Sequence, residues 1–218
     1  MYTPGIWSDA LKKKTHRKLL AVVQRIGALR NACSYRTVSE PAILVIAGTI
    51  SIDVLAQEKK KVFLKKAEVT KTVVKAEARA ATVEEWQQLL SLDHRGRWTN
   101  RLILELSNWL NRRHGETNYY LTQFLSGHGY FRDCLYKRGK VSNLKCGYCE
   151  EEEDDPKHTF FKCDRLADLK HRLESEIEEV TPDNVVGLML LNEEWWDRVS
   201  TYVETILCKK KQEGQLSG

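Results

Sequence analysis

The apolar positions of the chain recur at intervals of three and four residues over most of its length, which is the spacing of amphipathic helices. The first such stretch covers 19–29 and is expected to end near Cys33. Ser39 and Pro41 then mark the start of a second, short helix, and Gly48 marks its end. Alternating strand patterns are rare and no internal repeat is visible, so the sequence predicts a mainly α protein.

The middle of the chain continues the helical spacing with more positive charge. From Ser51 the apolar positions lie on one side and lysines surround the rest, which predicts one long basic helix reaching Lys75. Thr82 and Glu85 form a capping box, which predicts that a new helix starts there. Residues 93–100 then break the pattern.

Helical spacing restarts over 102–110 and ends in a group of basic residues. Arg112, Arg113 and His114 sit where the negative pole of that helix would lie, so they suit a capping role. Gly115 next to them also makes an exposed basic corner that could contact a ligand. The sequence leaves both readings open.

Four further helices are predicted in the last third of the chain. A short one over 121–125 ends at glycines, and a clear amphipathic one covers 166–180. Another covers 185–191, and Asn192 can cap a last helix, which is expected to fray from Lys209 onward.

Composition supports a folded protein. The chain has 218 residues, of which 42% are apolar and 30% charged, with only 4 prolines, so it can bury a core and is unlike a disordered chain. No apolar run approaches the roughly 20 residues of a membrane span, and no apolar segment precedes Lys12, so neither an anchor nor a signal peptide is expected. Three of the 6 cysteines lie beside a histidine, which favours a reducing compartment and a metal site over disulfides.

The charges divide the chain in two. Residues 1–145 carry 26 Lys plus Arg against 12 Asp plus Glu, whereas residues 146–218 carry 9 against 18. A basic part followed by an acidic part suggests a polyanion-binding region joined to a region that does not itself bind phosphate. Solvated surface charge is the alternative explanation.

The sharpest chemical signal is a Cys-x2-Cys-x8-His-x4-Cys pattern made by Cys146, Cys149, His158 and Cys163. Three thiolates and one imidazole suit tetrahedral Zn²⁺, and a closed set of four ligands predicts a structural zinc rather than a catalytic one. The alternative is four unrelated buried residues. The acidic run 150–155 inside the pattern would attract a cation and repel phosphate, so this face is not expected to lie on a nucleic-acid backbone.

Three strings in the chain resemble one family. Residues 146–163 resemble the zinc-binding segment that follows the reverse transcriptase of LINE-type, non-LTR retrotransposons, and residues 35–48 and 115–129 resemble the segment after the polymerase thumb. The matches keep the order of the family and extend from Trp7 to about Arg165. They imply the C-terminal part of a polyprotein whose earlier portions carry an endonuclease and an RNA-directed DNA polymerase.

The polymerase chemistry itself is not expected in this chain. Its metal-binding carboxylates belong to a Tyr-x-Asp-Asp-type motif, whereas Asp154 and Asp155 are the only adjacent aspartates and lie inside the zinc loop. No catalytic residue is therefore predicted, and the parent polyprotein rather than this region would be the enzyme. Met1 precedes a string that resembles an internal stretch, so the apparent start is expected to reflect a truncation.

The resemblance and the charge pattern together predict four parts. These are thumb-continuation helices over 1–57, a basic helical linker over 58–140, a CCHC zinc module over 141–165 and acidic C-terminal helices over 166–218. The expected function is an accessory region that binds RNA or DNA and works with the polymerase domain in cis, without a membrane or a small-molecule substrate. Its candidate nucleic-acid contacts are Lys59, Lys60, Lys61, Lys65, Lys66, Arg97, Trp98, Arg112 and Arg113.

Ordinary structural roles for these candidate residues, and a competing function for the chain, stay open. A lysine run is usually a solvated helix face and a lone tryptophan is usually core. The competing function is a zinc-stabilised protein-interaction module that uses the acidic loop and the helix over 195–206, and an independent enzyme ranks last. A nuclear location is expected for a protein acting on genomic targets, and Lys12 to Lys18 read either as an import signal or as a plain basic helix end.

Overall fold

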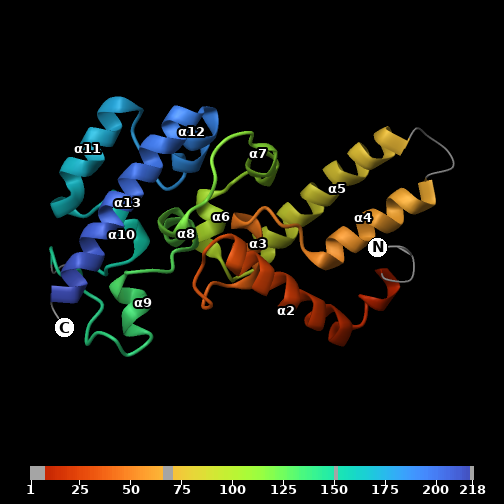
Figure 1. The fold of residues 1–218 in the computed structure, drawn as a ribbon, viewed down its shortest axis with the longest axis horizontal. Helices are drawn as coiled ribbons and strands as arrows, with labels where there is room; N and C mark the ends of the chain where they lie inside the picture. Colours follow the sequence, from red (N-terminus) through yellow and green to blue (C-terminus); the bar gives the residue numbers. More distant parts are fainter. Residues whose placement is uncertain (1–7, 66–70, 150–151, 217–218) are drawn as a thin grey trace.

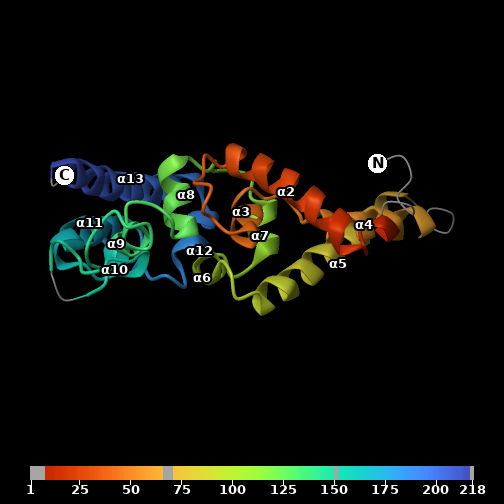
Figure 2. The same cartoon turned by 90° about the horizontal axis from the view of Figure 1, so that it is seen from below.

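The computed structural model describes residues 8–65, 71–149 and 152–216. The described part is built from helices, which confirms the mainly α prediction, and its one β-type pairing is an isolated bridge between Lys145 and Glu153. The molecule is elongated, with the pair α4 and α5 at one end and α11 and α13 at the other (Figures 1 and 2). No helix in the described residues is long and apolar enough to span a membrane.

The first two predicted helices are confirmed. The helix α2 covers Lys14–Asn31, and α3 covers Glu40–Ile46 with Pro41 in its first turn. The α3 helix is nearly enclosed, since each residue from Pro41 to Ile46 is buried, and it forms the centre of the N-terminal half. Gly48 follows it with a φ of 60°, the left-handed conformation that glycine tolerates at a helix end.

The long basic helix is a wrong prediction, because the segment forms two helices. The α4 helix covers Ile52–Lys65, α5 covers Lys71–Leu92, and the two pack side by side (Figure 1). Arg79 donates to the buried Glu58 at 2.9 Å and so joins α5 to α4. Residues 66–70 lie outside the described part, so the form of the connection is not assigned.

The helix start at Thr82 is also wrong. Thr82 lies in the interior of α5 and is only 1% exposed. Residues 71–81 are mostly alanine, lysine, glutamate and valine, without proline or glycine, and nothing among them ends a helix. The capping-box pattern is therefore overridden by a continuous run of residues that tolerate helical conformation.

Residues 93–111 contain two short helices. The sequence predicted a break over 93–100 and one helix over 102–110, so the first of the two helices was not predicted. The α6 helix covers Arg97–Leu102, directly after Gly96 with a φ of 70°, and α7 covers Leu106–Asn111. The side chain of Gln87 accepts a hydrogen bond from the backbone N–H of Leu106 at 2.8 Å. This contact from α5 fixes the start of α7 and separates it from α6.

The C-terminal half follows the predictions more closely. The α8 helix ends at Gly127, which has a φ of 69°, and the side chain of Asn192 accepts a hydrogen bond from Trp195 at the start of the last helix, as expected. That last helix continues to Leu216, so the fraying expected from Lys209 is wrong. The helices of this half are α8 (Tyr119–Ser126), α9 (Arg132–Tyr136), α10 (Pro156–Phe161), the 3-10 turn η1 (Asp164–Leu166), α11 (Ala167–Glu176), α12 (Val185–Leu191) and α13 (Glu193–Leu216).

One buried apolar cluster links the two halves. It extends from Leu29 in α2 to Leu207 in α13 and includes Trp109 and Phe124, both at most 1% exposed. The indole N–H of Trp109 donates to the carbonyl of Val45 at 2.8 Å, so α7 is fixed to α3. The predicted division into four parts stays a prediction.

Candidate metal centre

The four residues of the cysteine and histidine pattern meet in space. The ligand atoms of Cys146, Cys149, His158 and Cys163 all lie within 4.8 Å of one another. Cys146, His158 and Cys163 are each at most 4% exposed, and Cys149 is half-buried. The reading in which these four are unrelated buried residues is therefore wrong.

The spacing between the ligand atoms suits a tetrahedral ion. The sulfurs of Cys146 and Cys163 are 3.9 Å apart, and the sulfur of Cys149 is 3.3 Å from Nε2 of His158. A tetrahedral ion with Zn–S bonds of about 2.3 Å and a Zn–N bond of about 2.0 Å would space these pairs by about 3.8 Å and about 3.5 Å. The side chains therefore lie close to the positions that one zinc-sized cation would require.

A carboxylate orients the histidine. Nδ1 of His158 lies 3.2 Å from Oε2 of Glu152, and Lys162 also contacts that carboxylate at 3.3 Å. If Nδ1 carries the proton and donates it to Glu152, Nε2 has a free lone pair directed at the three sulfurs. Metal-binding histidines commonly have such a carboxylate partner.

Hydrogen bonds between residues close together in the sequence hold the backbone around the candidate ligands. The N–H of Cys146 donates to the carbonyl of Glu152 at 2.9 Å, which closes the loop that carries the first two cysteines. Asp155 caps α10 by accepting from the N–H of His158 at 2.7 Å, and Pro156 occupies the first turn, where its missing N–H is not needed. The helix start thus places His158 beside the two cysteines.

Burial makes the thiols hard to ionise without a cation. It raises the pKa of the Cys146 thiol, and burial together with the neighbouring Cys146 raises the pKa of the Cys163 thiol to about 12. Thiolate is the form that binds metal, and a bound cation lowers the cost of forming it. Ionisation of these two thiols is therefore linked to metal binding.

The acidic run is mixed in the described residues, because Glu152 and Glu153 are exposed whereas Asp154 is buried. Asp154 is only 3% exposed and is paired with Lys210 of α13, which is 8% exposed. The same carboxylate accepts from the hydroxyl of Thr159 at 2.7 Å and from the backbone N–H of Arg132 at 3.1 Å. The charge of Asp154 is therefore compensated inside the protein, and the expected repulsion of phosphate by the rest of the run stays a prediction.

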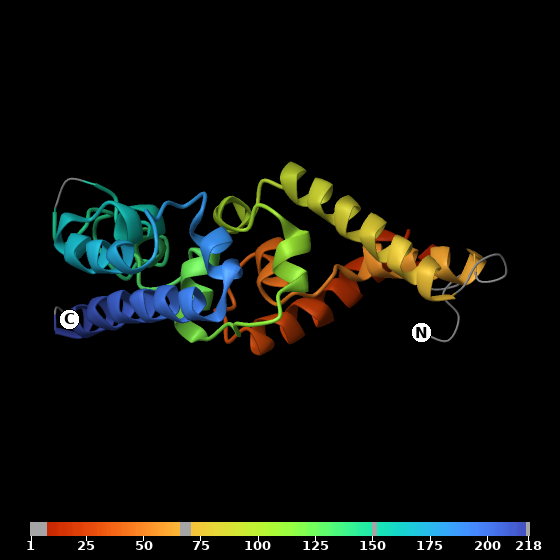
Figure 3. The same ribbon diagram turned by 90° about the horizontal axis from the view of Figure 1, so that it is seen from above.

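The metal centre is attached to the helical core by aromatic packing. Phe160 of α10 is 1% exposed, its ring lies 4.8 Å from that of Phe124, and its carbonyl accepts from the hydroxyl of Tyr202. His158 belongs to α10 and Cys163 directly precedes η1, and this part of the chain lies alongside α13 (Figure 3). It is thus part of the packed C-terminal half.

The structure does not bring the predicted nucleic-acid contacts into one surface. Lys59, Lys61 and Lys65 are exposed on α4, and Lys61 pairs with Glu85 of α5 at 3.5 Å. Lys60 is half-buried and pairs with Asp9 at 3.0 Å. Lys66 lies outside the described residues. These lysines occupy the end of the molecule opposite the metal centre (Figure 1).

The remaining candidates lie elsewhere. Arg97 and Arg113 are exposed, but Arg112 is half-buried, donates to the carbonyls of Trp109 and Gly115, and lies 4.0 Å above the ring of Trp109. Burial lowers the pKa of Arg112. Its contacts favour the capping reading over ligand contact.

Trp98 is half-buried and packs against the core. Its indole N–H donates to the carbonyl of Phe124 at 2.7 Å, and its ring packs 6.4 Å from that of Phe161. A Cβ added to Gly127 would lie 2.9 Å from this indole, so the backbone already approaches one side of it closely. This placement favours the core reading of Trp98 over a stacking platform.

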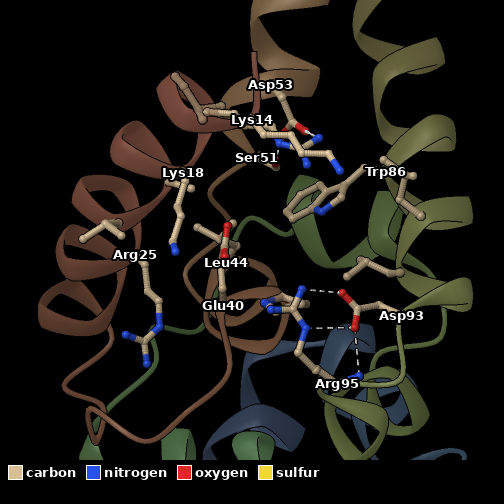
Figure 4. A pocket seen from close by; sticks show the side chains of 17 residues that line it. Lys14, Lys18, Arg25, Glu40, Leu44, Ser51, Asp53, Trp86, Asp93 and Arg95 are labelled. Carbon is tan, nitrogen blue, oxygen red and sulfur yellow. Dashed lines mark hydrogen bonds and ion pairs between the residues drawn. The ribbon is translucent and has the colours of Figure 1, made fainter. Parts of the chain in front are cut away.

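A groove that the sequence did not predict lies between α2, α3 and α5. It has a volume of about 550 Å³, and Lys14, Lys18 and Arg25 of α2 face Glu40 and the Asp93–Arg95 ion pair across it (Figure 4). The spacing of four and seven residues between the three basic positions of α2 could have placed them on one helix face. The sequence instead suggested only an import signal or a basic helix end for Lys12 to Lys18, and it assigned Arg25 no binding role.

Comparison with known proteins agrees with the family resemblance. No family model and no solved structure matches the chain. The chain is 27% identical over 180 residues to a retrovirus-related Pol polyprotein from the type-1 retrotransposable element R1 2 of Nasonia vitripennis, a match that covers 74% of this chain and 43% of the relative. A second Pol polyprotein, from element R1 4 of the same organism, is 24% identical over 238 residues, covering 99% of this chain and 57% of the relative.

The two matches differ in how much of each chain they cover. The chain spans about half the length of the curated relatives it matches. One of the two relatives matches nearly the whole chain, so the similarity is not limited to the cysteine and histidine segment. The predicted resemblance is therefore confirmed, and the chain is similar to a region of the Pol polyproteins of non-LTR retrotransposons.

Proposed function

We propose that this chain is a nucleic-acid-binding accessory region of a non-LTR retrotransposon Pol polyprotein, stabilised by one structural zinc ion. The similarity to R1 Pol polyproteins supports the retrotransposon context. The tetrahedral spacing of Cys146, Cys149, His158 and Cys163 supports zinc, because three sulfurs and one nitrogen are a preferred ligand set of structural zinc sites. The polymerase and endonuclease reactions belong to other portions of such a polyprotein.

The observation that carries the proposal is the convergence of two basic segments. Lys12, before α2, and Lys60, on α4, both pair with Asp9, at 2.9 and 3.0 Å. The basic start of α2 therefore lies beside the exposed lysines of α4. Lys12, Lys60 and Lys61 line one hollow together with Arg17, so two segments far apart in sequence meet here. We call the lysines of these two segments the α2–α4 basic face; they are Lys12, Lys13, Lys14, Lys18, Lys59, Lys60, Lys61 and Lys65, of which Lys61 also pairs with Glu85 of α5 at 3.5 Å. Such a face suits the phosphates of RNA or DNA.

The test is the salt dependence of duplex binding. Lys59→Gln, Lys61→Gln and Lys65→Gln together should reduce the slope of log affinity against log salt concentration by about 2.7, since each lost phosphate contact on a duplex contributes about 0.9. A matched control changes Lys157, Lys209 and Lys211 to glutamine, which removes the same charge from the acidic part. An unchanged slope in the first variant, or an equal change in both, would refute the proposed face.

The polymerase portion of the polyprotein is the proposed partner in cis. Four apolar side chains of α2 stay exposed, at 69% for Leu19, 49% for Val22, 67% for Val23 and 44% for Ile26. An apolar stripe of this kind usually marks a contact surface, and the matched relatives are much longer than this chain. Leu19→Asp with Val23→Asp should prevent co-purification with a separately expressed polymerase portion, whereas Lys13→Asp should not.

The competing reading as a protein-interaction module finds less support. Trp196, Val199 and Ile206 of α13 are each at most 2% exposed, because the apolar face of this helix packs on the rest of the chain. Asp154, Asp155 and Glu152 of the acidic run contact neighbouring groups of the metal centre. The apolar face of α13 and part of the acidic run are therefore already used in contacts within the chain, which leaves less surface for a partner.

A further inference from the structure

Three segments far apart in sequence meet at the hydroxyl of Thr37. Arg138, in the turn after α9, donates from Nη2 to Oγ1 of Thr37 at 2.6 Å. Nδ1 of His128, just after α8, lies 3.3 Å from the same oxygen. Two nitrogen-bearing side chains are thus already directed at one oxygen on the protein surface.

The backbone that carries these groups is held firmly. Arg25 donates from Nη2 to the carbonyls of Arg36 and Val38, at 2.5 and 2.7 Å, and so fixes the turn after α2. The hydroxyl of Tyr35 is hydrogen-bonded to that of Tyr119 at the start of α8. The cluster is therefore organised before any ligand arrives, which lowers the entropic cost of binding.

The charge of the cluster is positive and largely uncompensated. Arg36, Arg138 and Lys140 are exposed, and among the described residues none of them forms an ion pair with a carboxylate. Lys137 differs, because it pairs with Asp133 at 3.2 Å. Arg138 contacts the hydroxyl of Thr37, while Arg36 and Lys140 are close to Thr37 and Arg138 along the chain. Asp133 and Lys137 also act on the imidazole of His128. The mainly positive charge near this hydroxyl suits an anionic oxygen.

Aromatic rings lie among these cations. The guanidinium of Arg138 is 5.9 Å from the ring centre of Tyr35, and Tyr35 and His128 are both half-buried. Burial and the neighbouring Arg138 lower the pKa of His128, which favours the neutral ring. A partly exposed ring beside a cation can stack with an unpaired base, whereas the bases of a duplex stay inside the helix.

We propose that Tyr35, Arg36, Thr37, His128, Arg138 and Lys140 form a binding site for single-stranded nucleic acid. A phosphate oxygen takes hydrogen bonds from Arg138 and Thr37, Arg36 and Lys140 contact neighbouring phosphates, and a base stacks against the exposed edge of the cluster. The site lies near α8 and α9, away from the α2–α4 basic face at the other end of the molecule (Figures 1 and 2). This inference rests on the proposed nucleic-acid-binding function and adds a second surface with its own specificity.

The experiment measures the affinity of the full chain for a 20-nucleotide single strand and for the duplex of the same sequence, by fluorescence anisotropy over a series of salt concentrations. Arg36→Gln with Arg138→Gln should reduce the single-strand salt slope by about 1.4, since each contact on a single strand contributes about 0.7. The duplex slope should stay that of the unchanged protein. Arg172→Gln with Arg165→Gln removes the same charge from the C-terminal part and should change neither slope.

Further variants separate this site from the proposed function and from loss of folding. Lys140→Gln changes an exposed side chain without a hydrogen bond or ion pair, so the protein should fold normally and lose about 0.7 of the single-strand slope. An equal loss on both ligands, or no loss in either cluster variant, overturns the single-strand site while the α2–α4 basic face can still stand on its own lysine variants. If the unchanged protein binds neither ligand at low salt, both proposals fail.

Discussion

At the scale of single residues, the spacing of residues along the chain predicts the candidate metal ligands but does not predict the contacts of the acidic run. The clustering of the four candidate metal ligands could be predicted, because their separations along the chain are typical of a zinc site. The roles of Glu152, Asp154 and Asp155 could not, because they depend on which partners the fold brings close: an imidazole, a buried lysine and a helix N-terminus. Three acidic residues within four positions of the chain therefore make three different kinds of contact.

The contact of Glu152 with His158 leads to a prediction about metal affinity. Glu152→Gln replaces the carboxylate at 3.2 Å from Nδ1 with a neutral amide, so the imidazole loses basicity and orientation. The affinity for Zn²⁺ should fall by about 10-fold or more, as is typical when such partners are removed. Competition with a chromophoric chelator measures this affinity.

Glu153→Gln is the matched control, because Glu153 is exposed and adjacent in sequence. It removes the same charge without touching the histidine. Equal affinities for the two variants would mean that Glu152 acts only through its general negative charge.

The pair of Lys210 and Asp154 leads to a prediction about stability. Lys210→Met leaves a buried carboxylate without its cation, and breaking a buried ion pair in this way costs about 3 kcal/mol of unfolding free energy. Urea denaturation of the zinc-loaded protein measures the change. Lys209→Met, at the exposed neighbouring position, should change the unfolding free energy by less than about 0.5 kcal/mol. A similar loss in both variants would contradict the role assigned to the buried pair.

At the scale of helices, prediction succeeded where a terminus carries its own signal. The ends of α3, α8 and α12 lie next to glycine, proline or asparagine positions that cap helices, and these elements were predicted close to their observed bounds. The division into α4 and α5 was missed, because the stretch between them has neither glycine nor proline. The two helices pack against each other, and Glu58 of α4 is paired with Arg79 of α5. These contacts join residues far apart in the sequence, so the local pattern does not reveal them.

The continuity of α5 across Thr82 can be tested with proline. Ala81 is exposed, and Ala81→Pro would remove an interior hydrogen bond and clash with the preceding turn, at a cost of about 3 kcal/mol. Had a helix started at Thr82, the same proline would lie before it and be tolerated. Ala81→Gly is the comparison and should cost about 1 kcal/mol. Thermal unfolding followed by circular dichroism distinguishes these outcomes.

At the scale of the whole molecule, the charge division predicted from the sequence has a spatial counterpart. The α2–α4 basic face lies at one end, and the metal centre with α11 and α13 lies at the other (Figure 2). The sequence could not predict that Lys12 and Lys60 share Asp9, or that Thr37, His128 and Arg138 meet, because these contacts join residues separated by many others. Charge totals are visible in a sequence, whereas charged surfaces require the fold.

Removing the metal should affect the two ends of the molecule unequally. The metal centre holds α13 through the pair of Asp154 with Lys210 and through the hydrogen bond from Tyr202 to the carbonyl of Phe160. The contacts between α2, α3, α4 and α5 involve none of these residues. Because structural zinc contributes directly to folding, its loss should loosen the segment that depends on it.

Hydrogen exchange measured by mass spectrometry with and without a zinc chelator tests this inequality. Exchange should accelerate in 144–163 and in the second half of α13, while amides of α3 and α4 keep their protection. Cys149→Ser should reproduce the chelated pattern without chelator, since it removes one of the four ligands. Equal acceleration everywhere would mean that the chain unfolds as one unit, and unchanged exchange in α13 would mean that its packing on α8 and α12 holds it without help from the metal.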